Sequence, residues 1–150
     1  MGGRGERGEG RGNSLFLVVF YPNTFLMRRL HLRMVLALTH TKFEVYKLAG
    51  EIILECYQLM TQLPKDEKYN LIQQIKRASL SVKLNIAEGA SRKSIAERKR
   101  FYEIARGSLV ELDSALDVCT DLCFLKSGQL IQLGSKMNSC YAMLSKLISK

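Results

Sequence analysis

The sequence is poor in the residues and patterns that most non-helical folds need. It has no tryptophan and only two prolines, Pro22 and Pro64, in 150 residues. Segments in which apolar and polar residues alternate, the pattern typical of half-buried strands, are few. These absences favour an all-α protein. We expect one domain, because a single hydrophobic core commonly reaches this size.

Cysteines in a metal-binding or disulfide pattern are also missing. The four cysteines include no C-x-x-C pair, and no credible secretion signal precedes them. They are Cys56, Cys119, Cys123 and Cys140. Each falls at an apolar position of a helical pattern, so we expect reduced, buried thiols in a cytoplasmic protein. No metal-ligand cluster or phosphate-binding glycine loop is present, so no metal and no cofactor is expected.

Long apolar runs are absent as well. A membrane span needs about 20 apolar residues, and the run from Leu15 to Phe20 is soon broken by Pro22 and then by Arg28 and Arg29. The same run is short for a secretion signal and lacks a prompt cleavage site. We therefore expect no membrane insertion.

Residues 1–41 differ in composition from the rest of the chain. Met1–Gly12 holds six glycines and cannot contribute to a core. Met34 stands just before the region where helical periodicity begins, and is a possible alternative start. We expect 1–41 to be a disordered or non-native extension and 42–150 to be the folded domain.

From Lys42 to Lys150 the apolar residues recur every three or four positions in four segments. The predicted helices cover about 45–63, 68–88, 94–123 and 127–148. Because the connections between them are short, the sequence predicts an antiparallel up-down-up-down four-helix bundle.

Single residues near the helix ends carry further predictions. Gly89 stands where a left-handed C-terminal cap is wanted. Ser94 and Glu97 have the spacing of a capping box, and Ser127 is expected to cap the last helix. Gly107, inside the third helix, predicts close approach of a neighbouring helix, because glycine there otherwise costs about 1 kcal/mol relative to alanine.

Several stretches of the second and third helices resemble a known family. They are Tyr69–Val82, Asn85–Gly89 (N-I-A-E-G), Arg92–Ser94, Phe101–Ala105 and Gly107–Leu112 (G-S-L-V-E-L). These stretches resemble the bacterial four-helix bundle proteins, also called 23S rRNA intervening-sequence proteins because some are encoded within insertions in that rRNA gene. The resemblance covers about 42–150, whereas 1–33 has no counterpart.

The resemblance implies a four-helix fold that assembles into rings, often pentamers. In a related branch, the accessory proteins of diversity-generating retroelements, a basic pentameric surface binds nucleic acid and a reverse transcriptase. The partners implied are therefore further copies of this chain, RNA or DNA, and a protein such as a reverse transcriptase.

Charge is unevenly distributed along the second and third helices. Nine basic residues, opposed by three glutamates, are the candidate ligands of nucleic acid. They are Lys76, Arg77, Lys83, Arg92, Lys93, Arg98, Lys99, Arg100 and Arg106. The next segment has four acids and no base, and these acids are the candidate subunit-interface residues. They are Glu111, Asp113, Asp117 and Asp121. This order runs against the dipole of the third helix, which indicates that its charges serve something outside the helix.

Three interpretations of this charge pattern remain open. The basic residues bind phosphates, or the acidic end of one subunit meets the basic end of the next, or the charges are a solvated face with local pairs such as Glu103 with Lys99. Five tyrosines could stack on bases or pack within the bundle. They are Tyr46, Tyr57, Tyr69, Tyr102 and Tyr141.

A catalytic constellation is not recognisable. The only histidines, His31 and His40, lie in or beside the doubtful N-terminal segment. Glu88 and Glu97 could act as an acid and a base, but a contact with Arg92 and the capping box explain them equally simply. We therefore expect a non-enzymatic oligomeric protein that binds RNA or DNA, or alternatively an assembly or adaptor module without a nucleic-acid ligand.

Overall fold

The computed structural model describes residues 38–150, and all regular secondary structure in that range is helical. The possible alternative start at Met34 and most of the predicted extension therefore lie outside the described residues. Four α-helices are joined by three short connections; the first and the third contain 3-10 turns, and a further 3-10 turn precedes the first helix. The α-helices are α1 (Glu44–Leu59), α2 (Leu71–Ser91), α3 (Ile95–Asp121) and α4 (Ile131–Ser149). The 3-10 turns are Thr39–Lys42, Met60–Gln62, Lys65–Tyr69 and Ser127–Leu130.

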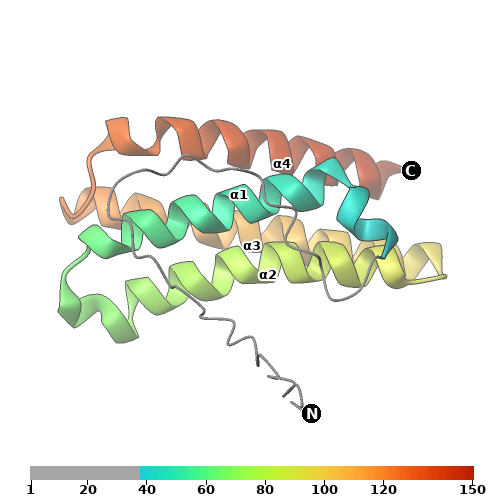
Figure 1. Cartoon of the computed structure of the whole chain (residues 1–150), viewed down its shortest axis with the longest axis horizontal. Coiled ribbons are helices and arrows are strands. Elements are labelled where there is room, and N and C mark those ends of the chain that lie inside the picture. The colour runs from blue at the N-terminus through green and yellow to red at the C-terminus, as the bar shows by residue number, and fades with distance from the viewer. Residues whose placement is uncertain (1–37) are drawn as a thin grey trace, which may run out of the picture. The chain divides into compact units, whose positions relative to one another are not determined.

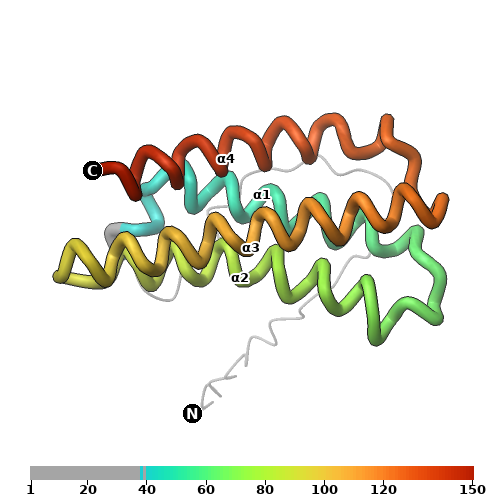
Figure 2. The backbone as a smooth tube through the Cα atoms, turned by 180° about the vertical axis from the view of Figure 1, so that it is seen from behind, coloured from blue at the N-terminus to red at the C-terminus, as the bar shows by residue number. Residues whose placement is uncertain are grey.

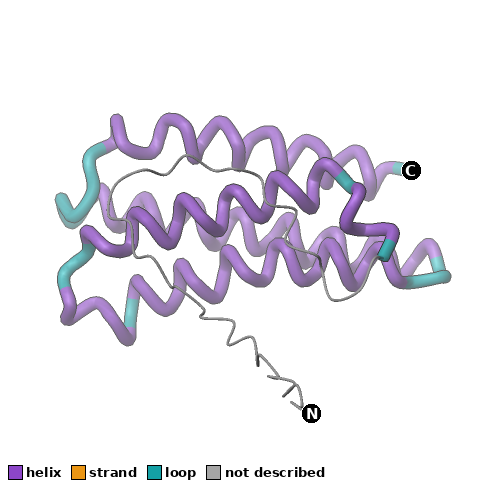
Figure 3. The backbone as a smooth tube through the Cα atoms, viewed as in Figure 1, coloured by secondary structure: helices purple, strands orange, loops and turns teal. Residues whose placement is uncertain are grey.

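The predicted four-helix bundle is confirmed, and residues 38–150 contain no strand. Each helix runs opposite to the one before it, and the helices follow one another around the bundle (Figures 1 and 2). The loops are confined to the two ends of the bundle (Figure 3). One end of the bundle therefore holds the connection between α2 and α3 together with both ends of the helical region, and the opposite end holds the other two connections. This arrangement decides which charges become neighbours.

The core consists of one apolar stripe from each helix. Ile52, Ile75, Leu112 and Leu144 represent the four stripes, and none of them is more than 1% exposed. α2 and α3 share the most extensive contact of any helix pair. Small residues permit this approach, and the Ser81 and Ser108 hydroxyls meet at 2.8 Å across it.

Three predictions about helix ends are wrong. Gly89 does not cap α2, because the helix continues to Ser91 and the glycine is buried. The Ser94 side chain makes no capping bond; instead the Arg98 guanidinium closes the turn by donating to the Arg92 carbonyl at 3.0 Å. Ser127 does not cap α4, which begins at Ile131 after a separate 3-10 turn.

The prediction that Gly107 admits a neighbouring helix is also wrong. A Cβ at this position would find no atom within 4 Å, so the site is open. The close approaches occur at two other glycines. A Cβ at Gly50 would meet the Lys83 ammonium at 2.7 Å, and one at Gly89 would meet the Tyr102 ring at 2.7 Å.

The end of α3 shows why one of the four cysteines departs from prediction. Cys123 is exposed and has a φ of 58°. Its N–H donates to the Thr120 carbonyl, and the N–H of Phe124 donates to the Cys119 carbonyl, both at 2.9 Å. This is the bonding pattern of a left-handed helix terminus. Cys56, Cys119 and Cys140 are buried and free, as predicted.

Candidate nucleic-acid interface

Four helix ends meet at one end of the bundle and bring many basic residues together. They are the start of α1, the end of α2, the start of α3 and the end of α4 (right side of Figure 1). We call this the basic end and define it by nine side chains. They are Lys42, Lys47, Arg92, Lys93, Arg98, Lys99, Arg100, Lys146 and Lys150. Three carboxylates oppose them there, from Glu44, Glu88 and Glu97.

The rest of the described chain is almost neutral by comparison. It carries eight Lys and Arg side chains against nine Asp and Glu side chains. The whole basic surplus of residues 38–150 is therefore located at one end, rather than spread along α2 and α3.

The turn between α2 and α3 holds the centre of this surface in a fixed conformation. Arg92 pairs with Glu88 one turn earlier, as predicted, and its guanidinium lies 5.0 Å from the centre of the Phe101 ring. Arg98 binds the Arg92 carbonyl, and Tyr102 packs against Gly89 below. Burial raises the pKa of Tyr102, while nearby Arg98 lowers it by a smaller amount. The cations of this turn are therefore carried by a well-packed backbone.

Several cations at this end have no ion-pair partner among the residues that the structure describes. Within residues 38–150 no carboxylate forms an ion pair with Lys93, Lys99 or Arg100. Lys93 and Arg100 are exposed, and Lys99 is half-buried. The pair proposed between Glu103 and Lys99 is absent. These three charges are available to an external anion.

The structure brings together five of the nine predicted basic residues: Arg92, Lys93, Arg98, Lys99 and Arg100. Two others face α1 instead. The ammonium of Lys76 lies 5.5 Å from the centre of the Tyr57 ring, and that of Lys83 lies 4.5 Å from the centre of the Tyr46 ring. Burial lowers the pKa of Lys83.

The remaining two predicted residues lie on further faces. Arg106 points to α4, where its guanidinium is 3.3 Å from the Ser145 hydroxyl and 5.6 Å from the centre of the Tyr141 ring. Arg77 lines a groove between α2 and α3. The nine residues therefore do not form one surface, and their roles in binding stay predictions.

Sequence reasoning missed four residues of the basic end: Lys42, Lys47, Lys146 and Lys150. The information needed to find them was the predicted topology itself. In an up-down-up-down bundle the first helix begins, and the last helix ends, beside the second turn. These four lysines are far from the second turn along the sequence but close to it in the folded bundle.

The four predicted interface acids are also separated. Glu111 accepts a long hydrogen bond of 3.5 Å from the Gln74 amide across the α2–α3 groove. Asp113 and Asp117 line a groove of about 320 Å³ between α3 and α4. Asp121 is the last residue of α3. Their part in subunit contacts stays a prediction.

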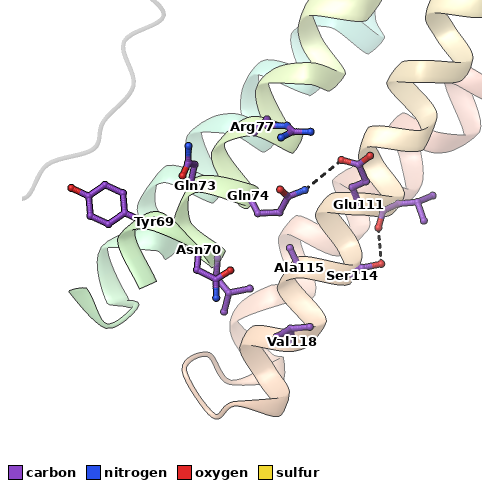
Figure 4. A pocket seen from close by; sticks show the side chains of 11 residues that line it. Tyr69, Asn70, Gln73, Gln74, Arg77, Glu111, Ser114, Ala115 and Val118 are labelled. Atoms are coloured by element: carbon purple, nitrogen blue, oxygen red, sulfur yellow. Dashed lines mark hydrogen bonds between the residues drawn. The ribbon is translucent and has the colours of Figure 1, made fainter. Parts of the chain in front are cut away.

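The groove between α2 and α3 lies toward the opposite end of the bundle from the basic end. It has a volume of about 630 Å³, within the range of small-ligand sites. Figure 4 shows Tyr69, Gln73 and Arg77 along one side and Glu111 and Ser114 on the other. Amide and hydroxyl groups dominate its polar lining.

The described residues offer little for redox or metal chemistry. Residues 38–150 contain no group of three His, Cys, Asp or Glu side chains placed to hold a metal ion. Burial raises the pKa of the Cys56 and Cys140 thiols to about 12, with Glu55 adding to the effect at Cys56. No helix in this part of the chain has the length and apolar character needed to cross a bilayer.

The chain is similar in sequence to a protein family and in structure to a solved protein. The family described as 23S rRNA-intervening sequence protein matches residues 41–146. A crystal structure of a protein of unknown function from the S23 ribosomal protein family of Bacteroides thetaiotaomicron has the same fold. It has a TM-score of 0.65 and 20% identity, and the match covers 71% of this chain and 99% of that one. No curated protein matches the chain.

Proposed function

Because the chain belongs to the 23S rRNA-intervening sequence protein family, we propose that it is a non-enzymatic helical protein that binds nucleic acid through its basic end. The observation that carries this proposal is the collection of nine Lys and Arg side chains against three carboxylates at one end of the bundle.

The chemistry of this surface suits phosphates better than any neutral ligand. Lysine and arginine side chains that neutralise phosphates release condensed counterions, and this release drives binding at low salt. Lys93, Lys99 and Arg100 have no carboxylate partner among residues 38–150, so a phosphate has no internal ion pair to displace. The packed turn beneath Arg92 and Arg98 limits the entropy lost on binding.

Salt-dependent binding of mixed-sequence RNA and DNA tests this proposal. We expect the logarithm of the binding constant to fall linearly with the logarithm of the salt concentration. The double variant Lys93→Glu/Arg100→Glu should bind much more weakly and with a shallower slope. The slope should decrease by about 0.7 for each lost contact to a single strand and by about 0.9 for each lost contact to duplex DNA.

A matched control changes the same amount of charge at the opposite end. Lys65→Glu/Lys126→Glu replaces two exposed lysines in the connections at that end. It should keep most of the affinity and the original slope. Equal loss in both variants would show that only net charge matters, and absence of binding by the native chain at low salt would refute the proposal.

A second candidate function is assembly or adaptation without nucleic acid. Asp113 and Asp117 favour it, because they line the α3–α4 groove and form no ion pair within residues 38–150. Charge-complementary subunits would place the basic end of one copy against these acids. Light scattering should then show a discrete oligomer that Asp117→Lys or Arg100→Glu weakens and the combination partly restores. A monomeric mass would exclude this arrangement.

A further inference from the structure

We propose that Tyr69, Gln73 and Arg77 form a base-binding stripe that receives the unpaired bases of a single-stranded nucleic acid. The inference rests on the proposed function and adds a substrate class to it. The basic end would hold phosphates, and the stripe would distinguish single strands from duplexes.

Tyr69 is the most exposed aromatic residue of residues 38–150. Its side chain is 79% exposed, whereas that of Tyr102 is 2% exposed. Tyr57 and Tyr141 are 42% and 43% exposed. The Lys68 ammonium lies 5.1 Å from the centre of the Tyr69 ring and adds a cation to it. An exposed aromatic ring next to a lysine offers a base both a stacking surface and a nearby positive charge.

The backbone that carries Tyr69 is nevertheless tied down. One carboxylate oxygen of Glu67 accepts from the Asn70 amide at 3.0 Å and from the N–H of Leu71, the first residue of α2, at 3.4 Å. The turn before α2 is thereby joined to the helix start on both sides of Tyr69. The backbone that carries the ring is thereby fixed while the ring stays exposed, and a fixed backbone lowers the entropy lost when a ligand binds.

Gln73 and Arg77, on the first turns of α2, line the same groove as Tyr69, which ends the 3-10 turn before the helix (Figure 4). Gln73 and Arg77 are four residues apart on α2, which is about 6 Å along the helix. Neither side chain forms a hydrogen bond or ion pair to another part of residues 38–150. The Gln73 amide can both donate to and accept from the edge of a base, and the planar Arg77 guanidinium can stack on a base or bind a phosphate.

Charge in the adjoining groove suits bases rather than a row of phosphates. Arg77 and Glu111 are the two charged residues of its lining, so their formal charges cancel. The 3.5 Å bond between Gln74 and Glu111 is long, and both groups can exchange it for a base. Uncharged base edges lose less by entering such a site than phosphates would.

The stripe and the basic end both lie along α2, so one strand of nucleic acid could run from one to the other. Arg77 and Arg92 are fifteen residues apart on α2 and its C-cap, about 22 Å at the helical rise. Leu80 and Leu84, 39% and 65% exposed, lie on α2 between them. A short single strand can therefore contact both regions, whereas a duplex keeps its bases stacked and unavailable to Tyr69.

The test compares Tyr69→Leu with Tyr57→Leu in the full chain. The probes are a fluorescent mixed-sequence RNA of twenty nucleotides and the same RNA in a duplex, measured by anisotropy. Tyr69→Leu should weaken single-strand binding about 5- to 100-fold, with an unchanged salt slope and unchanged duplex binding. Tyr69→Phe should bind like the native chain. Tyr57→Leu removes a partly exposed tyrosine beside a lysine on the α1 side, and should have no effect.

The outcomes separate this inference from the proposed function. The base-binding stripe would be refuted if Tyr69→Leu bound the single strand as tightly as the native chain does. It would also be refuted if this variant lost the same affinity for the single strand and for the duplex. Neither result would bear on the basic end, which has its own test. Equal loss in Tyr57→Leu would also overturn the stripe. Absence of all binding by the native chain would remove the proposed function and the stripe together. Circular dichroism and melting temperature confirm that each variant is folded.

Discussion

The ring of Tyr102 occupies the space that a side chain at position 89 would need. A Cβ on Gly89 would lie 2.7 Å from Cε1 and 2.9 Å from Cδ1 of that ring, and 3.2 Å from the Arg98 carbonyl oxygen. Because Tyr102 is buried, the ring has no free space into which to move. The last turn of α2 and the first turns of α3 are thus packed through a glycine and a tyrosine.

This contact predicts opposite effects for two identical substitutions. Gly89→Ala should destabilise the fold by about 1–3 kcal/mol, because overpacking outweighs the better helix propensity of alanine. Gly107→Ala is the matched control. Its Cβ would meet nothing within 4 Å inside α3, so it should stabilise by about 0.5–1 kcal/mol. Urea unfolding measures both, and stabilisation by Gly89→Ala would contradict the packing.

Cys123 predicts a stabilising substitution. Its φ of 58° is a left-handed conformation that costs a non-glycine residue roughly 1–2 kcal/mol. Cys123→Gly should therefore raise the free energy of unfolding by about 0.5–1 kcal/mol, after allowance for the freedom of glycine in the unfolded chain. Cys123→Ala keeps the strain and serves as the control. Equal stability of the two variants in urea would contradict the argument.

We expect only one of the four cysteine thiols to react quickly with a thiol reagent. Thiolate is the reactive form, and a thiol whose pKa is raised to about 12, as at Cys56 and Cys140, is protonated at pH 8. Burial also raises the pKa of Cys119. Ellman's reagent at pH 8 should titrate the exposed Cys123 rapidly, and Cys123→Ser should abolish this phase. The other three should react only after unfolding; more than one fast thiol would contradict the burial.

Lys136 predicts a pH-dependent contribution to stability. Its ammonium pairs with Glu55 and, at 3.1 Å, with Glu51, so α4 is tied to α1. The hydrogen bond to Glu55 is the largest cause of its raised pKa, followed by an opposing effect of burial. A raised lysine pKa means that the stabilisation is complete below the ordinary value of 10.5 and is lost as the pH rises above it.

Lys136→Met should therefore cost about 1–2 kcal/mol at pH 7, partly because it leaves two carboxylates one turn apart on α1. The cost should shrink at strongly alkaline pH. Lys126→Met, at an exposed lysine without an ion pair in residues 38–150, should cost under about 0.5 kcal/mol. Chemical unfolding of both variants at pH 7 and pH 11 measures the difference, and an equal cost at both pH values would contradict it.

Helix positions were predictable because apolar periodicity reports burial directly. The stripe containing Leu71, Ile75, Ala78 and Val82 is buried as its spacing indicates. Helix ends were less predictable, because local chemistry there competes with tertiary packing. Gly89 has the sequence context of a cap, but the Tyr102 ring required a residue without a side chain inside the helix.

The candidate site was predictable only in part, because residues that are close along the chain need not be close in space. Lys76 and Lys83 are seven residues apart, which places both on one face of α2, toward Tyr57 and Tyr46 of α1. Arg77, one position later than Lys76, points elsewhere. The lysines at the start of α1 and the end of α4 belong to the site because the bundle topology places these helix ends beside the α2–α3 turn. The exposure of Tyr69 could not be read from its spacing.

The concentration of positive charge at one end also affects how the bundle approaches other molecules. A polyanion within about a screening length, roughly 8 Å at physiological ionic strength, attracts that end, while the nearly neutral remainder of residues 38–150 feels little force. The resulting torque turns the helices to point at the polyanion before contact. Encounters are thereby biased toward end-on arrival, and this bias weakens as salt shortens the range over which the molecule can be turned.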